Sequence, residues 1–430
     1  MAYRDCRDLT VSLNTFKISA MSEPDVSELI SVERAIEIID AVEVSPRTNL
    51  VPLEQAQGLR LAVDIHADRD YPPFDKSLMD GFAVSCASVG TTPVNLVLVG
   101  EIPAGRAATR AIHSSETMAI MTGAPLPPGA DGVVPVEDVQ APVSREIGQP
   151  IRILRADNPT RYVTRQGSDI RHGEIVLGRG ALLGPAQLAV AASVGMANLE
   201  CYLRPRVAVL STGDELVPID GTPAASQIRN SNNIMLVALL RQFGCEVRDL
   251  GTAPDRPDAI RAAILKGLEL DALCVTGGMS MGEYDYVPKV LAELGVYMPI
   301  TKLKIKPGKP FVFGMRQTDG QAETKFIFGL PGNPVSAFVC VVRLASRLLR
   351  RMGGATVSDP PASAPLARPL PANGPREFYQ PAVLERGLVL PLNWKGSADL
   401  YTLARANILL LRPAHDAARA AGETVSYLCL

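Results

Sequence analysis

The spacing of apolar residues predicts a helix near the start of the chain. Residues 1–20 show no periodicity and are a candidate for a disordered tail. Ser31 then stands where a helix N-cap would, and apolar residues recur three and four positions apart from Val32 to Val42. This is the pattern of one face of an amphipathic helix.

The texture changes between residues 65 and 165, where short apolar runs alternate with proline and glycine. Val94–Val99 and Gly132–Val136 are two such runs. Short strands with frequent turns predict a small, mostly β domain. Further on, the alanine-rich stretch Ala181–Met196 is apolar enough to predict a buried helix.

Residues 205–352 alternate between strand-like and helix-like patterns. Arg206–Ser211, Cys245–Leu250 and Ala272–Thr276 read as strands, and helical patterns at 232–243 and 257–268 separate them. Continuous apolar strands in this alternation predict a parallel α/β sheet with helices on both faces. A proline-rich linker at 360–371 follows, and then a β-rich segment of roughly 60 residues.

Composition narrows the class of protein. A length of 430 residues exceeds what one hydrophobic core organises and suggests roughly three domains. The net charge of -2 gives no global indication of nucleic acid or of an anionic membrane, so an anion would need a local basic cluster.

Cysteine and histidine usage argues against several kinds of site. The seven cysteines are scattered and never form C-x-x-C, and none of the four histidines lies four positions from another. Disulfide frameworks and zinc sites are therefore not expected. The N-terminus lacks a signal-peptide core, and Arg343 and Arg347 interrupt the apolar segment Val335–Leu349. We expect a cytoplasmic protein without a membrane span.

Two segments with polar side chains follow predicted strands, where ligands bind in open α/β sheets. In Ser211–Glu215, the carboxylates of Asp214 and Glu215 could hold a metal ion, or could equally cap a helix. In Thr276–Asp285 the glycines could admit a phosphate, or could only turn the chain. Glu283 stands where a P-loop needs lysine, so an NTP-hydrolysing P-loop is excluded.

Two later segments point to oxyanions. If residues 302–306 form a strand, Lys302, Lys304 and Lys306 share one face, and Lys309 follows a Pro-Gly turn. This row favours phosphate, molybdate or another oxyanion, although a solvated edge strand protected by lysines is the alternative. In Leu330–Ser336, two prolines bracket Gly-Asn at a predicted helix N-terminus, which is either an anion site or a structural cap.

Six short motifs, in order, resemble those of the molybdopterin molybdenumtransferases, including the E domain of gephyrin. They are Met79–Val84, Met121–Pro125, Gly167–Ile170, Ser211–Leu216, Lys306–Pro310 and Leu330–Ser336. The resemblance runs from about Ser31 to the C-terminus. Two departures are Met279 within the Gly-Gly-x-Ser motif, and Arg256 after Asp255, where many members have a second acid.

The resemblance implies an elongated, four-domain subunit that forms a homodimer with its active site between subunits. The implied parts are a tail at 1–20, an N-terminal helix packing on the α/β domain at 21–46, a linker and dimerisation domain at 47–66 and 168–203, an inserted mostly-β domain at 67–167, an α/β molybdopterin- and nucleotide-binding domain at 204–354, and a C-terminal β-rich, barrel-like domain at 355–430.

The implied activity uses adenylylated molybdopterin and molybdate, and releases AMP in a Mg²⁺-dependent step to give molybdenum cofactor. The catalytic residues carried over are Asp80, Asp169, Glu215, Asp255, Asp285, Lys302 and Lys306, of which Glu215, Asp255 and Asp285 would organise the metal. The substrate-binding residues are Thr212, Gly213, Asp214, Gly277, Gly278, Ser280, Lys309, Pro331, Gly332, Asn333, Pro334, Ser336, Arg376 and Ser397.

Two other functions are alternatives to molybdenum insertion. A molybdopterin adenylyltransferase shares the α/β domain type but needs neither the insertion nor the C-terminal segment. A pterin-binding scaffold would not need the charged residues Asp80, Glu215, Lys302 and Lys306. The expected partners are an upstream adenylyltransferase and downstream molybdoenzymes or carrier proteins, with no nucleic acid and no membrane.

Overall fold

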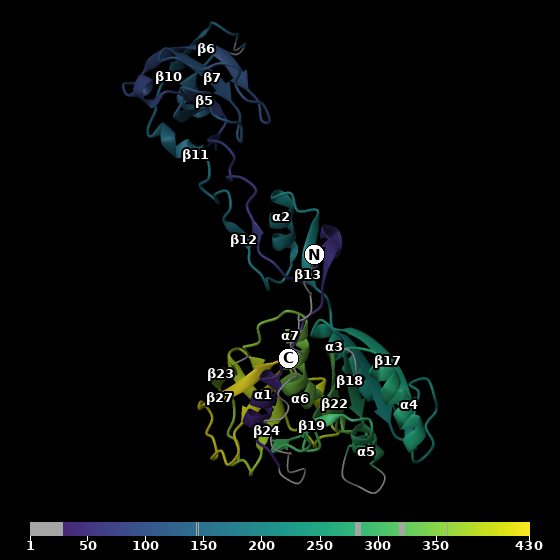
Figure 1. The fold of residues 1–430 in the computed structure, drawn as a ribbon. Helices are drawn as coiled ribbons and strands as arrows, with labels where there is room; N and C mark the ends of the chain where they lie inside the picture. The colour runs from purple at the N-terminus through teal and green to yellow at the C-terminus, as the bar shows by residue number, and fades with distance from the viewer. Residues whose placement is uncertain (1–28, 143, 145, 280–284, 318–322, 359) are drawn as a thin grey trace, which may run out of the picture. The chain divides into compact units, whose positions relative to one another are not determined.

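The computed structural model describes residues 29–142, 144, 146–279, 285–317, 323–358 and 360–430. They form two compact units (Figure 1). The large unit comprises the chain up to Arg47 and from Leu203 onward, and the inserted unit is Thr48–Tyr202.

The first helix, α1 (Val32–Asp40), begins as predicted. The Ser31 hydroxyl accepts a hydrogen bond from Arg34 N at 3.1 Å, and this satisfies one of the free N–H groups of the first turn. Its apolar face is buried in the core of the large unit, and Arg347 Nε donates to Asp40 Oδ1 at 2.9 Å. The periodicity prediction is confirmed.

The main sheet of the large unit has a parallel centre and an antiparallel edge. Its strand order is β17 (Glu246–Ala253), β14 (Arg206–Thr212), β18 (Ala272–Thr276), β22 (Thr324–Leu330), β21 (Val312–Gln317) and β19 (Tyr297–Ile300). The first four strands are parallel, and β21 and β19 run antiparallel to their neighbours. The predicted parallel α/β sheet is confirmed, with the antiparallel edge as an addition.

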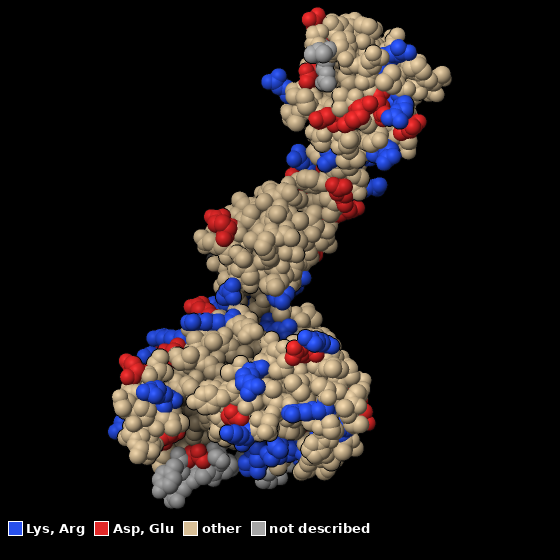
Figure 2. All heavy atoms as spheres, turned by 180° about the vertical axis from the view of Figure 1, so that it is seen from behind, with Lys and Arg blue, Asp and Glu red and all other residues tan. Residues whose placement is uncertain are grey.

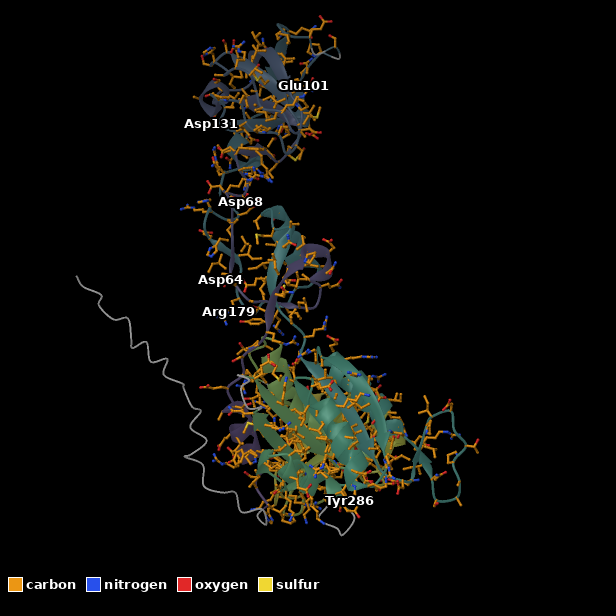
Figure 3. The ribbon with its side chains drawn as sticks, turned by 45° about the vertical axis from the view of Figure 1, so that its right-hand side comes forward. Asp64, Asp68, Glu101, Asp131, Arg179 and Tyr286 are labelled. Carbon is orange, nitrogen blue, oxygen red and sulfur yellow. The ribbon has the colours of Figure 1, made fainter. Side chains whose placement is uncertain are left out.

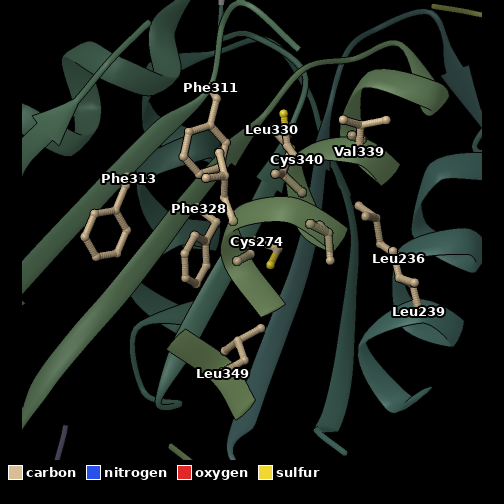
Figure 4. Packing of buried hydrophobic residues seen from close by; sticks show 14 of the residues in the cluster. Leu236, Leu239, Cys274, Phe311, Phe313, Phe328, Leu330, Val339, Cys340 and Leu349 are labelled. Atoms are coloured by element: carbon tan, nitrogen blue, oxygen red, sulfur yellow. The ribbon is translucent and has the colours of Figure 1, made fainter. Parts of the chain in front are cut away.

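Helices cover both faces of this sheet, as the alternating pattern predicted. One face packs against α1, α3 (Ser231–Gln242) and a continuous helix made of α6 (Pro334–Cys340), the π-helical segment η6 (Val341–Ala345) and α7 (Ser346–Met352). Figure 4 shows this core, in which Phe313 and Phe328 stack at 5.5 Å. The other face packs against α4 (Pro257–Gly267) and α5 (Tyr286–Glu293).

The C-terminal part forms a second sheet, which also includes a short strand from earlier in the chain. Its order is β20 (Ile305–Lys306), β24 (Glu377–Glu385), β26 (Ile408–Arg412), β27 (Thr424–Cys429) and β23 (Ala362–Pro365), with β25 (Leu388–Pro391) beside β24 and α8 (Leu400–Leu403) near its end. The β-rich prediction is confirmed. The linker predicted at 360–371 is partly wrong, because four of its residues form the edge strand β23.

The inserted unit contains a β-sheet with a buried cluster on each face. Its order is β8 (Gly132–Pro135), β5 (Gly81–Val84), β7 (Glu116–Ile120), β6 (Val94–Ile102), β10 (Pro150–Ile153) and β9 (Val139–Gln140). Short 3₁₀ turns lie between these strands, η3 (Cys86–Val89) and η4 (Val136–Asp138), and a further turn, η5 (Pro159–Tyr162), follows β10. The mostly-β texture is confirmed.

The rest of the inserted unit packs around one helix, α2 (Pro185–Ser193). Its other elements are β1 (Thr48–Pro52), β13 (Asn198–Tyr202), β2 (Arg60–Leu61), β3 (Ile65–His66) with β12 (Ile175–Leu177), β4 (Lys76–Ser77) with β11 (Val163–Thr164), and the turn η2 (Leu53–Gln55). In Figure 3, Asp64 and Arg179 lie together, where Arg179 N donates to Asp64 Oδ1 at 2.6 Å. The buried helix predicted at 181–196 is partly wrong: it begins at Pro185, and only Ala191 within it is buried.

The large unit holds both ends of the insertion together. Leu203 N donates to Arg47 O at 2.8 Å, so the chain leaves and re-enters at neighbouring points. Asp271, just before β18, accepts hydrogen bonds from Arg47 Nη2 at 2.8 Å and from Arg206 Nη2 at 2.7 Å. None of the helices in the described ranges combines the length and apolar character needed to cross a bilayer.

Candidate functional site

A cavity of about 610 Å³ lies in the large unit, where the parallel strands β14, β18 and β22 end. Loops after these strands form one part of its wall, the start of α3 another, and β20 with the C-terminal sheet the rest. A crevice beyond the carboxyl ends of parallel strands is the usual ligand site of open α/β sheets. Its size suits a cofactor-sized molecule.

Many of the predicted catalytic and substrate-binding residues line this one cavity, although they come from distant segments. Those that line it are Thr212, Glu215, Gly277, Lys306, Lys309, Pro331, Gly332, Asn333, Pro334, Ser336, Arg376 and Ser397. Gly213, Asp214 and Gly278 lie in the same loops without being part of its lining. Ser280 lies outside the described residues.

An asparagine that the sequence did not single out ties the cavity loops together. Asn232 Nδ2 donates to Thr276 Oγ1 at 3.2 Å and to Gly332 O at 2.7 Å, and Thr276 Oγ1 donates to Pro331 O at 3.0 Å. The start of α3, the end of β18 and the loop after β22 are therefore fixed relative to one another. The run of three asparagines around Ser231 was the available signal.

Below the cavity, a buried polar network supports the loops. Ser211 Oγ donates to Asn233 Oδ1 at 2.6 Å, and Asn233 Nδ2 donates to Asp249 Oδ1 at 2.6 Å. Asn230 caps α3 by accepting from Asn233 N at 3.1 Å, and its own amide donates to Thr252 Oγ1 at 3.0 Å. Because these buried polar groups are hydrogen-bonded to one another, they fix the floor of the site without the free-energy cost of an unpaired buried polar group.

The Thr212 hydroxyl differs from this network. Thr212 is 2% exposed and lines the cavity, and within the described part of the chain its Oγ1 has no hydrogen-bond partner. Gly277, with φ of +92°, packs against it so closely that a Cβ would lie 2.3 Å from Thr212 O. This close packing supports the interpretation of Gly277 as a residue that turns the chain, and the ligand role of the glycines stays a prediction.

The basic side of the cavity is smaller than the predicted lysine row. Lys304 and Lys306 are exposed while Leu303 and Ile305 are buried, so the predicted alternation is confirmed. Of the four lysines in this segment, all of which the structure describes, Lys306 and Lys309 line the cavity and Lys302 and Lys304 do not. The segment also forms β20 at the edge of its sheet, as the alternative interpretation of a solvated edge strand predicted.

Arginine and serine side chains complete this basic side. The Arg376 guanidinium lines the cavity while its Nη1 donates to Ile305 O at 3.3 Å. Asn333 stands at the predicted N-cap position of α6, but its side chain makes no capping bond. Its Nδ2 instead donates to Ser397 Oγ at 2.8 Å, and Val335 N donates to Ser397 O at 3.0 Å. These bonds join the C-terminal sheet to the start of α6.

Carboxylates gather beside the loop after β14. Asp214 and Asp255 exchange backbone hydrogen bonds, from Asp214 N to Asp255 Oδ2 at 3.3 Å and from Asp255 N to Asp214 Oδ1 at 3.1 Å. Burial raises the pKa of Asp255, and the negative charges of Asp214, Glu215 and Asp285 raise it further, against the lowering effect of the bond from Asp214 N.

This acidic group contains the three residues predicted to organise Mg²⁺. Among the described residues, no three acidic, histidine or cysteine side chains form a ready set of metal ligands. Magnesium is commonly held by one or two carboxylates with water and substrate phosphate oxygens. The donor type and mutual repulsion of Glu215, Asp255 and Asp285 fit a cation held in that way, and their metal role stays a prediction.

Asp80 and Asp169 belong to the inserted unit. Asp80 Oδ1 accepts from Thr122 N at 2.7 Å and from Thr122 Oγ1 at 2.8 Å, and these bonds lower the pKa of its carboxyl group. Asp169 is exposed, and its backbone N donates to Tyr71 O at 3.0 Å. Their predicted catalytic roles stay predictions.

The only tryptophan of the sequence was also missed. Trp394 lines the cavity, is half-buried, and lies 5.6 Å from Phe378 between ring centroids. No local pattern marks it, because it reaches the cavity through the long-range pairing of the C-terminal sheet with β20.

The chain is similar in sequence and in fold to known proteins of one family. The chain matches the MoeA N-terminal region (domain I and II) over residues 30–195, a probable molybdopterin binding domain over 208–351, and the MoeA C-terminal region (domain IV) over 363–430. It is 35% identical to the molybdopterin molybdenumtransferase of Haemophilus influenzae over 74% of this chain and 76% of that protein.

Other relatives are similar over nearly the whole chain. A molybdopterin molybdenumtransferase of Nostoc sp. is 32% identical, with 91% of each chain covered. Among solved structures, a molybdopterin biosynthesis MoeA protein of Pyrococcus horikoshii matches with a TM-score of 0.80 and 29% identity, covering 94% of this chain and 99% of that one.

Proposed function

Because the chain belongs to the molybdopterin molybdenumtransferase family, we propose that it inserts molybdenum into molybdopterin. We propose further that the substrates are adenylylated molybdopterin and molybdate, with Mg²⁺-dependent release of AMP. The observation that carries this proposal is the convergence of Lys306, Lys309 and Arg376 with three strand-end loops on one cavity.

The charges of the cavity suit a reaction between two anions. Cleavage of a phosphoanhydride beside molybdate requires positive charge at oxygens of both groups. Lys306 and Lys309 supply ammonium groups that act as point charges, and Arg376 supplies a planar guanidinium that can contact two oxygens at once. The hydroxyl groups of Ser336 and Ser397 stand on the same wall as further hydrogen-bond donors.

The acidic side would hold the metal ion. Glu215 lines the cavity, and burial together with the negative charges of Asp214, Glu215 and Asp285 raises the pKa of Asp255. A bound Mg²⁺ would neutralise charge on phosphoryl oxygens. Asn232 and Thr276 hold the surrounding loops in place. Loops fixed in this way would position the substrate phosphate against the lysines.

A homodimer is part of the proposal. Around α2 the inserted unit exposes several large apolar side chains. The surface of that region in Figure 2 has few charged side chains. The exposed fractions are 63% for Leu50, 52% for Ile175, 52% for Leu182 and 36% for Val190. Apolar groups gathered in this way mark protein contacts. The adenylylated substrate would come from an upstream adenylyltransferase, and the product would pass to molybdoenzymes or carrier proteins.

Reconstitution tests the proposed reaction. The full chain, adenylylated molybdopterin, molybdate and Mg²⁺ are combined, and AMP release is measured together with active cofactor. We expect AMP release to require molybdate. Lys309→Gln should lower the rate by about 10-fold or more, as loss of an oxyanion-stabilising group does. Lys304→Gln, on an exposed lysine outside the cavity lining, is the matched control.

Two results would contradict the proposal. Tight binding of the adenylylated pterin without AMP release would indicate a scaffold. Formation of adenylylated pterin from ATP, with no use of molybdate, would indicate an adenylyltransferase.

A further inference from the structure

Lys306 has an aromatic neighbour that the proposed reaction does not yet use. β20 pairs in parallel with β24, and Lys306 stands directly opposite Phe378 in the register. Side chains at such paired positions project to the same face. The Lys306 Nζ lies 4.6 Å from the centre of the Phe378 ring, and the Trp394 ring packs against Phe378 at 5.6 Å with a tilt of 31°.

The strand that carries Lys306 cannot by itself fix the ammonium group. β20 has two residues and lies at the edge of its sheet. A lysine side chain has four rotatable bonds, and ordering them costs up to about 2 kcal/mol in lost rotamer freedom. In the described part of the chain, no salt bridge holds Lys306.

A ring and a carboxylate would position a lysine with different consequences. A carboxylate would fix the ammonium group but would cancel its charge. The face of an aromatic ring attracts the ammonium through its quadrupole and leaves the positive charge available to a ligand. Phe378 is half-buried and its ring contacts both Lys306 and Trp394, so the packing of Trp394 restrains the orientation of the ring.

We propose that Phe378, supported by Trp394, is a positioning residue that holds the Lys306 ammonium at the oxyanion side of the cavity. The inference rests on the proposed function, in which Lys306 contacts an oxyanion. Phe378 then acts only through Lys306, and its contribution disappears when the ammonium is removed.

A double-mutant cycle tests this dependence. Molybdate binding to the full chain is measured by isothermal titration calorimetry for the unchanged protein, Phe378→Leu, Lys306→Gln and the double variant. Phe378→Leu should weaken binding about 2- to 5-fold, the range of a partly exposed cation–π contact. In the Lys306→Gln background it should change binding no further. Phe378→Tyr, which keeps the ring, should bind as the unchanged protein does.

Two controls separate positioning from folding. Lys304→Gln removes a charge on the neighbouring exposed position outside the cavity lining and should leave molybdate affinity unchanged. Thermal unfolding of each variant checks the fold, and Phe378→Met offers a second ringless side chain if Phe378→Leu unfolds.

The outcomes distinguish this inference from the proposed function. If Lys306→Gln binds molybdate normally, the oxyanion role of Lys306 is wrong, and the positioning role falls with it. If Lys306→Gln weakens binding and Phe378→Leu does not, only the positioning role is overturned. Equal weakening by Phe378→Leu in both backgrounds would also overturn it, because Phe378 would then act on the structure and not through Lys306.

Discussion

At the scale of single residues, the Thr212 hydroxyl is a polar group in the wall of the cavity whose hydrogen bonding the described residues do not account for. It is buried, and no partner for it is found among the described residues. An unsatisfied buried hydroxyl costs about 1–3 kcal/mol. Such a cost is tolerated where a substrate atom completes the hydrogen bond.

Thr212→Val should therefore have opposite effects on folding and binding. Removing the hydroxyl should leave the free energy of unfolding unchanged or raise it by about 1 kcal/mol, since no protein partner is lost. Affinity for the adenylylated pterin should fall. Urea unfolding and equilibrium binding measure the two effects, with Thr212→Ser as the control that keeps the hydroxyl. A clear loss of stability in Thr212→Val would show that the hydroxyl has a protein partner.

Residues of the cavity were predictable from the sequence where their type and local motif carry the signal. Lys306 and Asn333 stand in turn motifs whose proline and glycine pattern is visible in the sequence. Asn232 and Trp394 were missed because their place at the cavity depends on contacts far along the chain. Asn232 reaches Gly332, a residue on a different loop, and no periodicity reports such a contact.

At the scale of elements, local patterns predicted which residues are buried better than they predicted which strands pair. Alternation correctly placed Leu303 and Ile305 inside. It could not show that β20 joins β24 in the C-terminal sheet, because strand pairing over that separation is set by the tertiary fold. The alanine-rich pattern around α2 predicted a helix correctly but overestimated its burial within one chain.

Asp271 links the starts of two strands, and its removal should weaken the large unit. Burial raises its pKa, but the hydrogen bonds from Arg206 and the charges of Arg47 and Arg206 outweigh burial, and the pKa lies below its usual value. Asp271→Asn should lower the free energy of unfolding by about 1–3 kcal/mol at neutral pH, through loss of bonds to charged groups. Urea unfolding measures this change, with Asp220→Asn as an exposed control.

The same residue predicts a pH dependence. A carboxylate with a lowered folded pKa stabilises the fold fully above its unfolded pKa, which is about 4. That stabilisation is lost as the pH falls below this value through the folded pKa. The stability difference between the unchanged protein and Asp271→Asn should therefore shrink on acidification below about pH 4. A difference that stays constant down to pH 2 would contradict the ion-pair explanation.

At the scale of the whole molecule, the exposed apolar side chains around α2 predict an assembly. Leu182→Glu places a charge among them and should shift the protein from dimer to monomer in analytical ultracentrifugation. Ile147→Glu is the matched control, since Ile147 is 75% exposed on a turn before β10 and does not belong to the apolar cluster around α2. If the unchanged protein sediments as a monomer at all concentrations, the dimer proposal is wrong.

The hydrogen bond from Leu203 N to Arg47 O has a consequence for how this chain could be altered. The 155 residues from Thr48 to Tyr202 begin and end at adjacent points of the large unit. A short glycine link could therefore replace them without moving α1, the main sheet or the cavity. Because its two ends meet at this hydrogen bond, the insertion is a segment that a designer could try to remove, lengthen or exchange.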